Sequence, residues 1–228
     1  EGLSKTKEEF SKFGIPIFIY KVDVSNLDEI KINAQKVRTE VGKIDILINN
    51  AGIVVGQYCH ENTHQDIQKT MLINSNALMH VTLEFLPEMM KENSGAICNI
   101  ASSAGLISNP KMAVYAASKW AVNGWSDSLR LEMEQLKKNI SVTTIMPFYI
   151  NTGMFDGVQS KLIPILEPEP TAEKIIKSIE NKSKILAMPL PYWFIRISQG
   201  ILPLSIFDWV MDHVFGVYDI MKYFRGRK

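Results

Sequence analysis

The sequence of 228 residues predicts an α/β fold, a doubly wound parallel sheet with helices on both faces. Two observations predict this class. Short runs rich in β-branched residues alternate with longer amphipathic segments along most of the chain. Hydrophobic residues make up 46% of the chain, which is enough for a large core. No linker and no internal repeat interrupts the alternation, so the strands and helices are expected to build one domain.

The first elements follow from local signals. Residues 15–24 form a β-rich run bounded by turn residues, which predicts a strand. Ser25 is expected to cap the next helix, with Asp28 three residues later in capping-box style. Gly42 occupies the place of a C-terminal cap. Residues 44–48 are nearly all apolar, as in a strand buried on both faces. The helix between them carries one apolar stripe, which consists of Leu27, Ile30, Ala34, Val37 and Val41.

The rest of the chain continues the same pattern. Thr63 and Asp66 predict a second capping box, at the start of a helix that runs towards Met90. The remaining predicted elements are a strand over residues 96–101, a helix from Tyr115 to about Lys138, a strand over 140–146 that ends at Pro147, a helix over 171–181 and a last strand over 185–188.

The composition excludes several functions. With 25 basic and 24 acidic residues the net charge is +1, whereas a protein that binds nucleic acid by neutralising phosphates normally shows a basic excess. Cys59 and Cys98 are too few for a disulfide framework, which indicates a reducing, cytosol-facing environment. The four histidines show no metal-ligand spacing, so we expect no metal.

Tyr115 and Lys119 lie four residues apart in a predicted helix, so their side chains share one face. An unperturbed tyrosine has a pKa of about 10. A nearby ammonium group lowers that pKa, and the pair is then suited to moving a proton on or off a substrate oxygen. The alternative is a chance pair on an amphipathic helix, because this spacing is common.

Two further features lie at the carboxyl ends of predicted strands, where open α/β sheets bind ligands. Ser102 comes thirteen residues before Tyr115, and its hydroxyl could bond the reacting oxygen. Ser103 competes for this role, and a serine here could simply cap a turn. The sequence NNAG at residues 49–52 could form an ordinary turn or could let a cofactor approach the backbone closely.

Together these residues resemble the short-chain dehydrogenase/reductase family. The motifs that carry the resemblance are NNAG, the serine at its thirteen-residue spacing, and YxxxK. The resemblance implies a Rossmann-like fold and NAD or NADP as the cofactor. It also implies a catalytic tetrad of Asn74, Ser102, Tyr115 and Lys119, in which the asparagine positions a water in the proton relay.

The same resemblance implies a set of cofactor-binding residues. Tyr115 and Lys119 would hold the nicotinamide ribose, and Asp23 would meet the adenine ring. The other expected cofactor-binding residues are Asn50, Ala51, Gly52, Pro147, Ile150 and Thr152. One departure concerns the glycine-rich TGxxxGxG turn that receives the pyrophosphate. This turn is not in the sequence. We expect it to lie before residue 1, together with the residue that chooses between NAD and NADP, so the sheet would be N-terminally incomplete.

Within the family, the sequence is similar to the group of epidermal retinol dehydrogenases and 17β-hydroxysteroid dehydrogenases. The similarity rests on PFYINTGMF at residues 147–155, PILEPE at 164–169 and the terminal YFRGRK. Phe148, where many family members carry glycine, fits this group. The similarity implies a small hydrophobic substrate such as a retinoid, a steroid or another lipid alcohol, with Met154 and Phe155 as apolar walls. It also implies a cytosol-facing location at the endoplasmic reticulum membrane or a lipid droplet.

The last part of the chain differs in character from the predicted dehydrogenase domain over residues 1–188. Residues 185–195 and 197–207 are uncharged, yet each run is shorter than the roughly 18 residues that span a membrane. Aromatic residues lie among prolines, and the chain ends in a basic cluster. Residues 189–228 are therefore expected to form an apolar helical extension. It would either associate with a membrane surface or serve as a substrate lid and subunit contact, as in a homodimer.

Two alternatives to a retinoid or steroid dehydrogenase remain open at this point. One is a related oxidoreductase that acts on a fatty alcohol or a xenobiotic carbonyl. The other is a catalytically inactive family member that acts as a binding or scaffold protein at a lipid surface.

Overall fold

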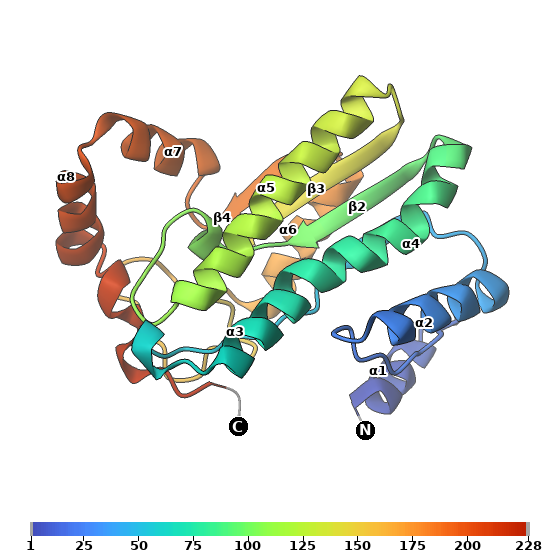
Figure 1. Cartoon of the computed structure of the whole chain (residues 1–228), viewed down its shortest axis with the longest axis horizontal. Coiled ribbons are helices and arrows are strands. Elements are labelled where there is room, and N and C mark those ends of the chain that lie inside the picture. Colours follow the sequence, from blue (N-terminus) through green and yellow to red (C-terminus); the bar gives the residue numbers. More distant parts are fainter. Residues whose placement is uncertain (1, 227–228) are drawn as a thin grey trace.

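The computed structural model describes residues 2–226, and a four-stranded parallel sheet lies at its centre (Figure 1). The strands are adjacent in chain order: β1 (Ile46–Asn49), β2 (Gly95–Ile100), β3 (Ile140–Pro147) and β4 (Ile185–Met188). Every pairing is parallel, and Figure 1 shows helices on both faces of the sheet. The predicted α/β class with a doubly wound parallel sheet is therefore confirmed.

The helices supply both layers around the sheet. α4 packs against β1 and β2 and α5 packs against β3, whereas α6 lies behind the sheet in Figure 1. A π-helical turn at Leu72–Asn76 joins α3 to α4, so the long helix predicted to start near residue 63 is interrupted. The α-helices are α1 (Gly2–Ser11), α2 (Leu27–Glu40), α3 (His64–Met71), α4 (Ala77–Glu92), α5 (Ala113–Gln135), α6 (Pro168–Glu180), α7 (Tyr192–Ile201) and α8 (Leu204–Trp209).

One predicted helix cap is confirmed and one is wrong. Thr63 Oγ1 accepts a hydrogen bond from the Asp66 N–H, and the Asp66 carboxylate accepts one from the Thr63 N–H, as a capping box requires. α2 is capped by Asn26 instead of Ser25. Asn26 directly precedes the first helical residue, and its Oδ1 accepts bonds from two backbone N–H groups of the first turn. Ser25 donates its hydroxyl to Asp23 instead.

The strand predicted over residues 15–24 does not form. The described residues give this run no hydrogen-bonded partner strand, and β-propensity becomes a strand only where a second strand completes the ladder. The prediction that β1 is buried on both faces is also wrong. Ile46 and Ile48 are 53% and 48% exposed, because α4 packs on the opposite face of this edge strand, around Leu47.

A buried polar network connects the sheet to its helices at the end where the strands terminate. The side-chain amide of Asn49 in β1 donates to Thr82 in α4 at 2.9 Å and to Asn99 in β2 at 2.8 Å. Asn99 in turn donates to Ser126 in α5 at 3.0 Å. A buried polar group is costly without a partner, so this network fixes the positions of two strands and two helices relative to one another.

After β4 the chain leaves the sheet and forms α7 and α8 at one side of the molecule (Figure 1). Ile195 and Phe207 turn inward and are buried in the core. Other large apolar side chains of the segment are exposed, among them Trp193, Ile197, Ile201, Leu204, Ile206 and Trp209. Within residues 2–226, no helix is both long enough and apolar enough to cross a membrane.

Candidate active site

A cleft of about 280 Å³ lies at the carboxyl ends of β1, β2 and β3. In open parallel sheets this is the edge at which ligands bind. Most of the residues predicted to be catalytic or to bind the cofactor line it: Asn50, Gly52, Ser102, Tyr115, Lys119, Pro147, Ile150 and Thr152. Met154, one of the two predicted apolar walls, also lines the cleft.

Two predicted cofactor residues take other positions. Ala51 lies between Asn50 and Gly52 but is not part of the cleft wall. Asp23 does not line the cleft either. Its carboxylate accepts hydrogen bonds from the backbone and the hydroxyl of Ser25, which hold its pKa below the usual range. The predicted contact of Asp23 with adenine stays a prediction.

Lys119 is buried and its ammonium faces the cleft. Its Nζ donates to the backbone oxygen of Ile100 at 2.9 Å and lies 5.7 Å from the centre of the Tyr115 ring. The two side chains therefore share one helix face, as their spacing predicts. Burial lowers the pKa of Lys119 to about 8, because the charged form loses its hydration.

The Tyr115 phenol is also buried, and burial raises its pKa to about 12. Interaction with the Ser102 hydroxyl opposes this shift. The predicted net lowering of the Tyr115 pKa is therefore wrong for the protein alone, because desolvation is the largest effect on this phenol. The phenol thus carries its proton at neutral pH.

The two candidate serines occupy different positions. Ser102 follows β2, and its Oγ accepts a hydrogen bond from the Ala104 N–H at 3.1 Å. It lines the cleft together with Tyr115 and Lys119, whereas Ser103 does not. The geometry therefore favours Ser102 as the group that meets the reacting oxygen.

Asn74 is fully buried in the π-helical turn at Leu72–Asn76. Its Oδ1 accepts from the Ile53 N–H at 2.8 Å, and its Nδ2 donates to the Ile53 oxygen at 2.9 Å and to Ser118 Oγ at 3.0 Å. Both amide hydrogens are thus used within the protein. Its observed contacts support the wall of the cleft. The predicted role in positioning a water is not tested by these contacts and stays a prediction.

Sequence reasoning missed two residues that support the site. Ser118, directly before Lys119, accepts from Asn74 Nδ2, and its hydroxyl donates to the backbone oxygen of Tyr115 at 2.7 Å, so it joins the asparagine to the helix that carries the tyrosine. Gly105 lies so close to α5 that a Cβ atom would stand 2.8 Å from the Lys119 oxygen. The only sequence signals are a serine inside YxxxK and a glycine three residues after Ser102.

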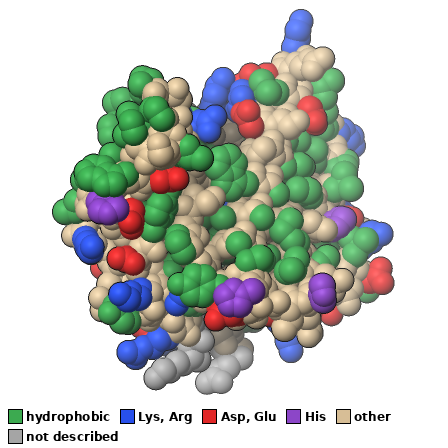
Figure 2. Space-filling view, turned by 60° about the vertical axis from the view of Figure 1, so that its left-hand side comes forward, with side chains coloured by type: hydrophobic (Ala, Val, Ile, Leu, Met, Phe, Trp, Pro, Cys, Tyr) green, Lys and Arg blue, Asp and Glu red, His purple; other side chains and the backbone are tan. Residues whose placement is uncertain are grey.

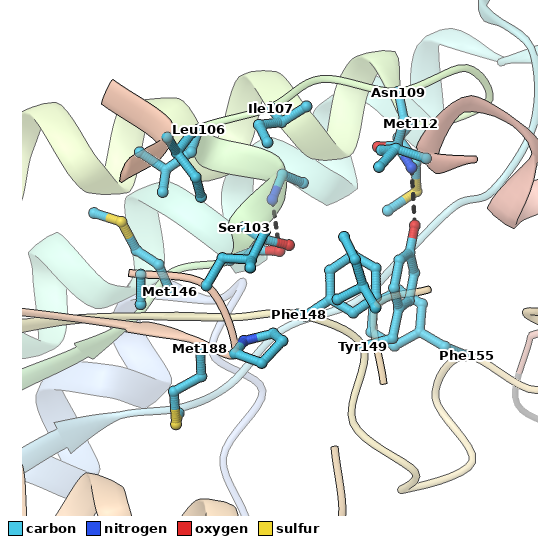
Figure 3. A pocket seen from close by; sticks show the side chains of 18 residues that line it. Ser103, Leu106, Ile107, Asn109, Met112, Met146, Phe148, Tyr149, Phe155 and Met188 are labelled. Atoms are coloured by element: carbon cyan, nitrogen blue, oxygen red, sulfur yellow. Dashed lines mark hydrogen bonds between the residues drawn. The ribbon is translucent and has the colours of Figure 1, made fainter. Parts of the chain in front are cut away.

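An apolar pocket, shown in Figure 3, adjoins the cleft. Ser102 and Phe148 line both the pocket and the cleft. The free space inside is about 40 Å³, so a larger apolar ligand would enter only by displacing flexible walls such as Met112 and Met146. Phe155, the second predicted apolar wall, lines this pocket. Its ring meets the Tyr115 ring edge-on, with the two ring centres 6.2 Å apart. The other apolar lining residues include Leu106, Ile107, Ile163, Met188, Leu190, Ile195 and Val217.

The cleft residues fit the nicotinamide half of a dinucleotide. The Lys119 ammonium has three N–H groups, and one protein acceptor, the Ile100 oxygen, is seen for it among residues 2–226. The remaining donors are available for ribose hydroxyls. Within the same residues there is no cluster of side chains that could hold a metal ion.

Comparison with known proteins agrees with this geometry. Residues 1–162 match the family model of the short chain dehydrogenases. The chain is 37% identical over 216 residues to epidermal retinol dehydrogenase 2 of Mus musculus, covering 93% of this chain and 70% of that protein. It is 34% identical over 203 residues to estradiol 17-beta-dehydrogenase 11 of Macaca fascicularis, covering 89% and 68%. It is 33% identical over 210 residues to retinol dehydrogenase 10-B of Danio rerio, and the matched segment covers 90% of this chain and 62% of that protein. The chain thus spans about two thirds of the length of these relatives.

Solved structures share the fold. Serine dehydrogenase from Escherichia coli superposes with a TM-score of 0.69 at 26% identity, covering 82% of this chain and 81% of the other. A short-chain dehydrogenase/reductase from Burkholderia phymatum in complex with NAD gives a TM-score of 0.76 at 21% identity, covering 87% and 80%.

Proposed function

The chain belongs to the short-chain dehydrogenase family, whose members are oxidoreductases that act on CH–OH groups with NAD or NADP, and we propose that it interconverts a lipid alcohol and the corresponding carbonyl compound. One observation carries the proposal. Ser102 lines both the cleft that contains Tyr115 and Lys119 and the adjoining apolar pocket. A substrate oxygen held at Ser102 would have its carbon skeleton in the pocket and its reacting carbon beside the cleft.

Each site residue has a chemical role in this proposal. Tyr115 is the general acid/base, and its protonated phenol donates to the carbonyl oxygen in the reductive direction. Ser102 orients and polarises that oxygen. Lys119 holds the ribose of the cofactor with the N–H groups that the Ile100 oxygen does not use. The bound nicotinamide supplies or accepts the hydride.

The pocket and the named relatives support the proposed substrate class. The pocket walls are mostly Met, Phe, Leu, Ile and Val side chains, which suit a hydrocarbon skeleton. The similar proteins are named for retinol and estradiol. We therefore propose a retinoid or a hydroxysteroid as the substrate.

We further propose that α7 and α8 dock the enzyme on the cytosolic surface of the endoplasmic reticulum membrane or of a lipid droplet. Figure 2 shows apolar side chains gathered over this part of the molecule. Ile201 and Leu204 are 73% and 74% exposed, which is more apolar exposure than a solvated surface needs. Ile195 of α7 lines the apolar pocket, so a lipid alcohol could pass from the membrane into the site.

The proposed activity is tested with the full-length protein. All-trans-retinol and estradiol are each supplied with NAD or NADP in excess, and formation of the reduced cofactor is followed by its absorbance. We expect turnover with at least one of the four combinations, and loss of that turnover in Tyr115→Phe. Binding of both dinucleotide and lipid without turnover in any combination would instead identify a catalytically inactive binding protein.

A further inference from the structure

The apolar pocket contains one polar pair that the proposed reaction does not use. Apart from Ser102 and Ser103, its described lining residues have two polar side chains, Asn109 and Tyr149. The Asn109 Nδ2 donates to the Tyr149 phenol oxygen at 2.9 Å. Figure 3 shows this pair on the side of the pocket opposite Leu106 and Met146.

We infer that Asn109 and Tyr149 recognise a second oxygen of the substrate, and that the enzyme selects lipid alcohols that carry a further hydroxyl group. This inference rests on the proposed function, because it concerns the substrate of that site. It divides the proposed substrates into two groups. Retinol has a single oxygen, which the reaction uses, whereas many hydroxysteroids carry a second one.

The hydrogen-bonding capacity of the pair supports the inference. Tyr149 accepts from Asn109, so its own O–H remains to be donated, and residues 2–226 offer no acceptor for it. The Asn109 Oδ1 likewise has no donor within the described residues. One unused donor beside one unused acceptor matches a hydroxyl group, which accepts and donates at once. A carbonyl oxygen would use only the phenol.

The Tyr149 side chain is fixed in place for such a role. It is 6% exposed, and its ring meets the rings of Phe148 and Phe155 edge-on, with the ring centres 4.8 Å apart in both pairs. Burial also raises its pKa above the ordinary value for tyrosine, so the phenol keeps its proton and acts as a donor. A buried phenol that is fixed and still has a free hydrogen penalises a ligand that offers no acceptor.

Asn109 also lies at the border of the pocket. It lines an open groove of about 580 Å³ on the outside, together with Trp120. The enclosed pocket and the open groove thus meet at this residue. A polar end of the substrate at Asn109 would face water, whereas its hydrocarbon skeleton would stay in the apolar interior.

The test uses two steroids that differ only in the second hydroxyl, 5α-androstane-3β,17β-diol and 5α-androstan-17β-ol. The full-length enzyme is supplied with excess cofactor, and kcat/KM is measured for each steroid. We expect the wild type to prefer the diol. Tyr149→Phe removes one oxygen and keeps the ring, so it should lower the ratio of diol to mono-ol about tenfold, the effect of one hydrogen bond.

Two further variants secure the interpretation. Asn109→Ala should also lower the ratio, and it keeps the test valid if Tyr149→Phe folds poorly. Tyr20→Phe is the control. It removes a phenol oxygen that donates to Glu40, and neither of these residues lines the pocket, so the ratio of diol to mono-ol should stay as in the wild type. Equal ratios in the wild type, Tyr149→Phe and Asn109→Ala would overturn the inference.

Failure of the proposed function would look different. In that case the wild type turns over neither steroid. The thermal shift that each steroid causes in the cofactor-loaded protein then decides the inference. A larger shift with the diol in the wild type, lost in Tyr149→Phe, supports it. Equal shifts with the two steroids overturn it.

Discussion

The side-chain amide of Asn74 pairs with both backbone groups of Ile53, much as a neighbouring strand would. Oδ1 accepts from the Ile53 N–H at 2.8 Å, and Nδ2 donates to the Ile53 oxygen at 2.9 Å. Ile53 directly follows the NNAG segment and lines the cleft. The π-helical turn that carries Asn74 thus fixes the loop on which the cofactor is expected to lie, and π-helical turns are frequent at functional sites.

Asn74→Ala should therefore destabilise the protein by about 3 kcal/mol, because it leaves the Ile53 backbone groups and Ser118 without their partner. Urea unfolding followed by far-UV circular dichroism measures the loss. Asn76→Ala is the matched control, since this asparagine is exposed and belongs to the same turn. Its effect should stay within about 0.5 kcal/mol. Similar losses in both variants would argue against the specific role of the Asn74 amide.

Tyr115→Phe should keep the fold and lower kcat by about 10² to 10⁴, because it removes the proton carrier and little else. The unfolding midpoint tests whether the fold is kept, and steady-state rates with excess cofactor test the fall in kcat. Tyr20→Phe serves as the control for loss of a phenol outside the site. A variant that retains near wild-type rates would show that another group moves the proton.

Lys119 predicts a dependence of stability on pH. Burial lowers its pKa in the folded protein to about 8, against 10.5 for the free side chain. Between these values the unfolded chain binds the proton and the folded protein does not, so the free energy of unfolding rises with pH from about 8 to about 10.5. Over that window the gain from Lys119 is about 3 kcal/mol.

Lys119→Met removes this titration and isolates its contribution. The difference in unfolding free energy between the variant and the wild type is measured at pH 7 and at pH 10. We expect the variant to be more stable than the wild type at pH 7 and this difference in unfolding free energy to be smaller at pH 10. At the higher pH the Lys119 side chain is neutral in the folded wild type, which then no longer buries a charge. A difference that is the same at both pH values would show that the ammonium remains well solvated.

Gly105→Ala should destabilise the protein by about 1 to 3 kcal/mol and lower activity, because the new Cβ would stand 2.8 Å from the Lys119 oxygen. Gly124→Ala in the interior of α5 is the matched control. Its Cβ meets nothing within 4 Å, so this change should stabilise the helix by about 0.5 to 1 kcal/mol. A lower unfolding temperature for Gly105→Ala together with a higher one for Gly124→Ala would confirm the close packing of Gly105 against α5. Changes in the same direction would contradict it.

The double change Ile201→Ser with Leu204→Ser should weaken the binding of the full-length protein to anionic liposomes at least tenfold in a flotation assay, because both side chains are exposed on the segment proposed to dock. Leu83→Ser in α4 removes a similarly exposed leucine, 65% accessible, and should leave flotation as it is. If the double variant floats like the wild type while subunit association changes, α7 and α8 form a subunit contact instead.

Local signals predicted the parts of the fold that depend on neighbours in sequence. The Thr63–Asp66 capping box needs only a spacing of three residues, and it was confirmed. The shared face of Tyr115 and Lys119 follows from the helical period. β2 and β3 each have a neighbouring strand on both sides, and β4 pairs with β3, so the β-rich runs of these three strands identified them correctly.

The errors came from features that depend on distant parts of the chain. Residues 15–24 have strand propensity, but pairing requires a neighbour that no local pattern specifies. The Asn109–Tyr149 bond joins residues 40 positions apart, and the closeness of Gly105 to α5 arises only when the turn after β2 packs on the helix. The helix cap was misplaced by one residue. α2 begins at Leu27, so Asn26 and not Ser25 is the residue whose side chain reaches the N–H groups of the first turn.

The amides of Asn49 and Asn99 lie directly opposite each other in the β1–β2 pairing. A slip of one residue between these strands would place an apolar neighbour, Cys98 or Ile100, opposite Asn49, and its buried amide would lose an acceptor. The pair therefore distinguishes the correct alignment from its nearest competitors during folding. It thereby fixes the register of two short strands. The relative positions of the strand ends that form the cleft depend on this register.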